Sequence, residues 1–61
     1  MPTIHVELLE GRTVEQKRAF VEAVTQVVVD TLGGSVSSVD VIFNDVATHN
    51  WATAGKLWIE P

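Results

Sequence analysis

The sequence predicts an α/β protein. Each subunit is a β-α-β unit with a short C-terminal strand or hairpin, and other copies of the chain complete its sheet. Apolar residues alternate with polar ones over residues 3–8 and again over 39–44, which is typical of half-buried strands. Between them, apolar residues recur every three or four positions, which favours an amphipathic helix. A chain of 61 residues is also too short to bury a large core.

The first strand is expected over residues 3–8, where Ile4, Val6 and Leu8 share one face. The second is expected over residues 39–44. A strand, a helix and a further strand favour a crossover connection with parallel strands. The remainder, 45–61, is expected to be a loop that contains four small residues at 52–55. A brief strand or hairpin arm is expected over 57–59.

The helix is expected over Val14 to Leu32. Thr13 and Gln16 form a capping-box pattern that begins a helix, and Gly33 supplies the left-handed stop that helix ends favour. The side expected to be buried carries five residues: Phe20, Val24, Val27, Val28 and Thr31.

Composition restricts what the protein can be. The chain has no cysteine, and His5 and His49 lack a regular ligand spacing, so neither disulfides nor a metal are expected to supplement the core. With 46% hydrophobic residues, a single domain over residues 1–61 leaves apolar surface exposed. Two strands alone also leave backbone edges unpaired. We therefore expect a homo-oligomer in which copies share strands.

The charge pattern excludes further classes of partner. The formal net charge is −4 and the four basic residues are scattered, whereas a nucleic-acid surface needs a basic stripe. The sequence contains neither a signal-peptide pattern nor a long apolar run, so no membrane association is expected and a cytoplasmic location is the default.

Three stretches together resemble the 4-oxalocrotonate tautomerase family of the tautomerase superfamily: PTIHVELLEGRTVEQK, VSSVDVIFNDV and NWATAGK. The resemblance covers essentially the whole chain. It implies dimers, usually assembled into a hexamer, with active sites lined by more than one chain and without a cofactor. It implies that Met1 is removed and that Pro2 acts as general base and acid on a small enol or 2-oxo acid. Arg12 would bind the substrate carboxylate, and Trp51 would form an aromatic pocket wall.

One position departs from the family pattern. Well-studied members carry a second arginine where this sequence has Asp40, and that arginine polarises the carbonyl oxygen of the substrate. A carboxylate would instead repel an enolate, so we expect poor activity toward dicarboxylates. His49 and Asn50 are candidate hydrogen-bond donors to the developing oxyanion in place of the arginine.

Each candidate also has a simpler interpretation. A proline that begins a strand is ordinary, Arg12 fits a solvated charge in a turn, and Trp51 fits an interface contact. For Pro2 to act as a base, an apolar pocket or a nearby cation must lower the pKa of its amine. The alternative functions are hydration or dehalogenation of an unsaturated acid, with Asp40 orienting a water, and a non-catalytic oligomeric module.

Overall fold

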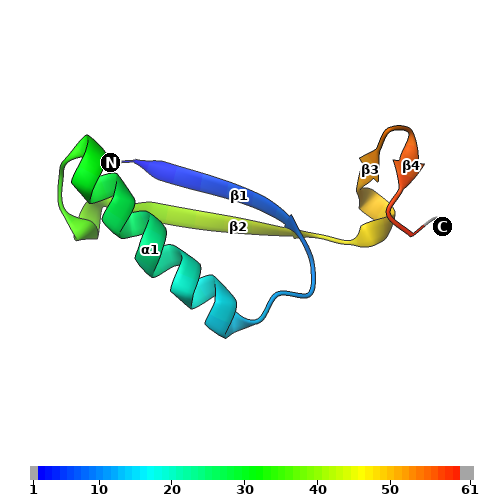
Figure 1. The fold of residues 1–61 in the computed structure, drawn as a ribbon, viewed down its shortest axis with the longest axis horizontal. Coiled ribbons are helices and arrows are strands. Elements are labelled where there is room, and N and C mark those ends of the chain that lie inside the picture. Colours follow the sequence, from blue (N-terminus) through cyan, green and yellow to red (C-terminus); the bar gives the residue numbers. More distant parts are fainter. Residues whose placement is uncertain (1, 60–61) are drawn as a thin grey trace.

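The computed structural model describes residues 2–59 and has the expected β-α-β arrangement (Figure 1). Strands β1 (Thr3–Leu9) and β2 (Asp40–Val46) pair in parallel, and helix α1 (Val14–Leu32) connects them. Strand β2 begins one residue later than predicted. It also includes Asp45 and Val46, which were expected to belong to the C-terminal loop. Met1, whose removal is expected, lies outside the described residues, as do residues 60 and 61.

The C-terminal segment forms a hairpin, which Figure 1 shows beyond the far end of β2. Strand β3 (Ala52–Thr53) pairs antiparallel with β4 (Lys56–Leu57). The expected hairpin is confirmed, but its position was wrong in two respects: part of the small-residue loop is a strand, and residues 58 and 59 follow the second arm. The turn places Ala54 at φ 54° and Gly55 at φ 81°, the positive angles of a tight hairpin turn.

The register of the parallel strands fixes which side chains share a face. Thr3 lies opposite Asp40, and the pairing continues to Leu9 opposite Val46. Successive side chains of a strand point to opposite faces, so one face of the sheet is apolar and lies toward α1. That face carries Ile4, Val6, Leu8, Val41 and Phe43, all half-buried. On the other face, Ile42 remains 49% exposed.

Both ends of α1 follow the sequence signals. The Gln16 backbone N–H donates to Thr13 Oγ1 at 3.1 Å, and the Thr13 N–H donates to Gln16 Oε1 at 2.9 Å. This reciprocal pair is the predicted capping box. At the other end, Gly33 has φ 84° and its N–H donates to the Val29 carbonyl at 3.1 Å. The predicted bounds of the helix, Val14 to Leu32, are confirmed. They could be predicted because short-range hydrogen bonds set them.

The predicted buried face of α1 is correct only in part. Val28 is buried, but Val27 is 57% exposed and Thr31 is also exposed. Phe20 is partly exposed and packs against Phe43, with ring centroids 5.8 Å apart. Val24 is half-buried as predicted, and so are Val21 and Val29, which were not predicted. The line of contact with the sheet therefore runs along a row displaced from the predicted one, because the orientation of the helix on the sheet selects which row is covered.

Within residues 2–59, Val28 is the one residue that is buried, at 7% exposure. The molecule measures 44 × 23 × 14 Å, and its radius of gyration is 14.7 Å, whereas a compact chain of this length has about 10.5 Å. None of the helices in this part of the chain combines the length and apolar character that crossing a bilayer requires. A single subunit therefore lacks the core of an independent domain.

Candidate active site

Pro2 and Asp40 lie at the end of the sheet where both strands begin. Pro2 is half-buried at the start of β1, and its carbonyl accepts a hydrogen bond from the Asp40 backbone N–H at 3.0 Å. Asp40 is the first residue of β2 and its side chain is exposed. The main chain thus holds these two candidates at the same end of the subunit.

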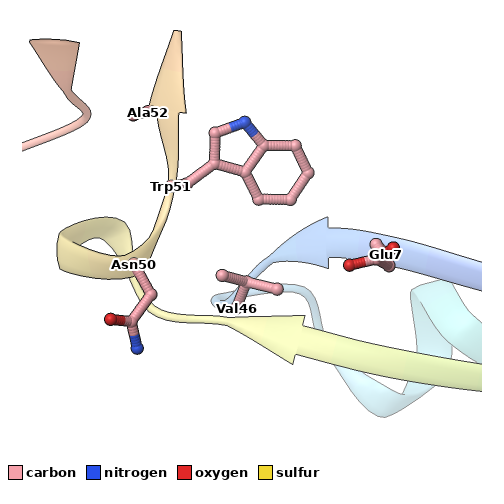
Figure 2. Close-up of a pocket in the computed structure, with 5 residues that line it drawn as sticks. All are labelled: Glu7, Val46, Asn50, Trp51 and Ala52. Carbon is pink, nitrogen blue, oxygen red and sulfur yellow. The ribbon is translucent and has the colours of Figure 1, made fainter. Parts of the chain in front are cut away.

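A pocket of about 310 Å³ lies at the opposite end, where β2 runs into the hairpin (Figure 2). Asn50, Trp51 and Ala52 line it from the segment that follows β2, and Glu7 and Val46 line it from the two strands. Figure 2 shows the Trp51 indole directed into the space above the strand ends, whereas the Asn50 amide points away from the indole. Trp51 and Asn50 are therefore brought to one pocket.

Trp51 is held through its main chain. Its N–H donates to the Thr48 carbonyl at 3.4 Å, and its carbonyl accepts from the Trp58 N–H at 2.9 Å. The Trp58 indole Nε1–H also donates to Thr53 Oγ1 at 2.9 Å, which ties the residue after the hairpin to β3. The hairpin consequently fixes the backbone from which the pocket wall projects.

Arg12 lies at the same end of the sheet as Trp51 but on the other face. It is exposed in the turn between β1 and α1, and it lines a separate pocket of about 250 Å³. The other residues that line this pocket are Val6, Leu8, Gln16, Lys17 and Phe20. Val6 and Leu8 point toward α1, whereas Glu7 beside Trp51 points the opposite way. Within one subunit, Arg12 and Trp51 therefore lie on opposite sides of the sheet.

The strands also separate Pro2 from Arg12 and Trp51. Six steps along β1, at about 3.3 Å each, put roughly 20 Å between the two ends of the sheet. A substrate of a few carbon atoms cannot touch Pro2 and either Arg12 or Trp51 of the same chain. Any site that combines them takes residues from more than one copy.

The described residues leave Arg12 as an available cation. Lys17 forms an ion pair with Asp45 at 2.5 Å and lies 5.5 Å from the centroid of the Phe43 ring. Within residues 2–59, Arg12 has neither an ion pair nor a side-chain hydrogen bond. Those same residues contain no group of three His, Asp or Glu side chains that would hold a metal ion.

Sequence reasoning missed Glu7 and Val46 as lining residues of the Trp51 pocket. The alternation of β1 places Glu7 on the open face, but only the parallel register shows that it lies beside Asn44 and near the segment that follows β2. Val46 was expected to lie in the loop over residues 45–61. Its role as the last residue of β2 depends on its pairing with Leu9, a contact between positions far apart in the sequence.

The geometry defines a class of protein: a small β-α-β subunit in which Pro2, Arg12 and Trp51 lie on three separate parts of the surface. The sequence model of one family, described as "Tautomerase enzyme", matches residues 2–58. The chain therefore belongs to the tautomerase family, and the resemblance drawn from its sequence is confirmed.

Individual relatives agree with this assignment. A probable tautomerase of Ralstonia nicotianae is 47% identical over 55 residues, covering 90% of this chain and 79% of the relative. A 2-hydroxymuconate tautomerase of Bacillus subtilis is 45% identical over 56 residues, covering 92% and 90%. A solved structure of a 4-oxalocrotonate tautomerase isozyme from Methylibium petroleiphilum has a TM-score of 0.91 at 41% identity, covering 95% of this chain and 91% of that one.

Proposed function

We propose that the protein is a cofactor-free tautomerase that moves a proton between oxygen and carbon of a small enol or 2-oxo acid. The observation that carries this proposal is the family match over residues 2–58, which begins at Pro2. The class of substrate comes from the relatives named 2-hydroxymuconate tautomerase. Pro2 is the proposed general base and acid, and Arg12 the proposed anchor of the substrate carboxylate.

In the proposed reaction, Met1 has been removed and the Pro2 nitrogen is a neutral secondary amine. The nitrogen accepts the proton of the enol hydroxyl, and the O–H electron pair forms the carbonyl double bond. The electrons of the carbon–carbon double bond then form a C–H bond with the proton that Pro2 returns. No proton is gained or lost overall, so a single group whose pKa lies near neutral pH can serve as base in the first step and as acid in the second.

Arg12 is suited to hold the substrate during this transfer. A guanidinium binds a carboxylate through two parallel N–H···O bonds, which fix orientation as well as position. An unpaired Arg12 beside the Pro2 amine of another copy would also lower the pKa of that amine and favour its neutral form. Trp51 is the proposed apolar wall, and Asn50 the proposed hydrogen-bond donor to the substrate oxygen.

We further propose that the working protein is a homo-oligomer built from dimers, most simply a hexamer. Three observations support assembly: the extended shape, the single buried residue within residues 2–59, and the roughly 20 Å that separates Pro2 from Arg12 and Trp51. Among residues 2–59, nine large apolar side chains remain at least one third exposed: Val14, Phe20, Val27, Leu32, Val36, Ile42, Leu57, Trp58 and Ile59. Burial between copies would remove this apolar surface from water.

The expected native mass is about 40 kDa, six times the 6.7 kDa of one chain. Light scattering after size-exclusion chromatography measures it directly. Dilution should lower thermal stability together with the fraction assembled, because association and folding are coupled when a monomer lacks a core. A folded monomer of 6.7 kDa that remains active would contradict the shared site.

Asp40 is expected to set the preferred charge of the substrate. If it enters the assembled site, its carboxylate repels a second negative charge, and Lys17 is already paired with Asp45. We expect phenylenolpyruvate, a monocarboxylate, to react with a higher kcat/KM than 2-hydroxymuconate, a dicarboxylate. Asp40→Asn should raise kcat/KM for the dicarboxylate about fivefold, corresponding to about 1 kcal/mol between close charges in water, and leave the monocarboxylate within about twofold. Equal changes for both substrates would exclude this role.

One alternative function uses Asp40, whose backbone N–H donates to the Pro2 carbonyl. The Asp40 carboxylate would accept a proton from a water whose oxygen bonds to one carbon of the double bond of an unsaturated acid, while a protonated Pro2 supplies a proton to the other carbon. Hydration or dehalogenation would then exceed ketonisation. Rates measured on a 3-haloacrylate and on phenylenolpyruvate, with the same preparation, distinguish the two functions.

A further inference from the structure

The turn that carries Arg12 is fixed on both sides. Before it, the Glu10 backbone N–H donates to the Val46 carbonyl at 2.9 Å, which attaches the start of the turn to β2. Gly11 follows with φ 118°, a conformation that other residues rarely adopt. After it, Thr13 is engaged by the capping box. Gly11 and Arg12 are thus the two residues between the hydrogen-bonded positions Glu10 and Thr13.

The second anchor depends on the Gln16 side chain. Its Oε1 accepts the Thr13 N–H at 2.9 Å, while Thr13 Oγ1 accepts the Gln16 N–H at 3.1 Å. The Thr13 carbonyl also accepts the Lys17 N–H at 3.1 Å. The peptide unit that joins Arg12 to Thr13 therefore has its N–H directed at Gln16, and rotation of that unit would break this bond.

Gln16 also lines the pocket of about 250 Å³ that Arg12 lines. The Arg12 guanidinium itself makes no hydrogen bond within residues 2–59. The backbone around Arg12 is therefore fixed, while the N–H donors of its side chain stay available. A fixed backbone with free donors is the arrangement that lowers the entropic cost of binding.

We propose that Gln16 is a positioning residue for Arg12: through the capping box with Thr13, it holds the turn in the conformation that presents the guanidinium to a carboxylate. The inference rests on the proposed function in one respect, namely that Arg12 binds carboxylates. It goes further by assigning a binding role to a helix cap that would otherwise contribute only to stability.

The test measures the binding of benzoate, a non-reacting monocarboxylate with an apolar ring. Isothermal titration calorimetry gives its Kd for the assembled wild type, Gln16→Ala, Arg12→Ala and the double variant. We expect Gln16→Ala to weaken binding about fivefold, the equivalent of one neutral hydrogen bond. In the Arg12→Ala background, the same change should have no further effect.

A second pair of variants separates positioning from folding. Thr13→Ala removes the other half of the capping box and should also weaken benzoate binding. Thr13→Ser keeps the hydroxyl and should bind benzoate as tightly as the wild type does. Both alanine variants are expected to lower stability. If they do so without changing the benzoate Kd, the cap is purely structural and the inference is wrong.

Other outcomes are equally decisive. A Gln16→Ala effect of the same size with and without Arg12 would overturn the inference, as would a wild type that does not bind benzoate. Turnover of phenylenolpyruvate is measured separately on the same wild-type preparation. If that turnover is absent while Gln16 and Arg12 remain coupled in benzoate binding, the proposed function fails and the positioning role stands.

Discussion

Blocking the Pro2 nitrogen should lower kcat/KM for phenylenolpyruvate by about a hundredfold to ten-thousandfold, the range that general acid–base catalysis contributes. An N-terminal extension left in place converts the amine into an amide, which has no basic lone pair. The comparison is with the same chain processed to begin at Pro2, after intact mass has verified both forms. Equal native mass of the two assemblies serves as the control for folding.

Pro2→Ala provides a graded version of this experiment. Alanine retains a primary amine in place of the secondary one, so we expect reduced but measurable turnover. Because a base must be unprotonated to accept the enol proton, kcat/KM of the processed wild type should rise with pH through the pKa of the amine. A blocked chain that remains as active as the processed one would favour the non-catalytic oligomeric module and background catalysis.

Arg12→Ala should raise KM for phenylenolpyruvate by about tenfold to a hundredfold, because hydrogen bonds to charged groups contribute about 1.5–3 kcal/mol. The neutral methyl ester of the same enol should be affected little. Arg12→Lys should give an intermediate KM, since lysine retains the charge but loses the planar fork.

Arg18→Ala is the matched control for Arg12. Arg18 is also exposed, but it lies on α1 and lines none of the pockets described above. Its removal changes the net charge of the protein by the same amount, so it reports any general electrostatic effect on anionic substrates. A similar KM increase for the acid and for its ester in Arg12→Ala would refute the carboxylate role.

The helix shows where sequence reasoning succeeded and where it failed. Thr13, Gln16 and Gly33 gave its two ends correctly, because the groups that cap a helix lie within four residues of one another. The periodic pattern gave the buried row only in part: Val24 and Val28 are covered as predicted, but the structure exposes Val27. Several rows of an apolar helix are compatible with burial until a sheet is placed against it.

The candidate site divides in the same way. The resemblance of the sequence to its family selected Pro2, Arg12 and Trp51, and their roles stay predictions. Their separation was not readable from the sequence. It follows from the strand residues that each one lies beside: Arg12 shares a pocket with Val6 and Leu8, whereas Trp51 shares one with Glu7, which points to the opposite face.

By itself, the sequence determined the β-α-β order, the helix ends and the chemistry available to the protein, because these depend on residue identity and on contacts between near neighbours. Only the tertiary structure decided which row of the helix faces the sheet and that the proposed base, Pro2, lies roughly 20 Å from Arg12 and Trp51. Both results arise from pairing between segments that are distant in the chain, and no local pattern encodes the geometry of that pairing.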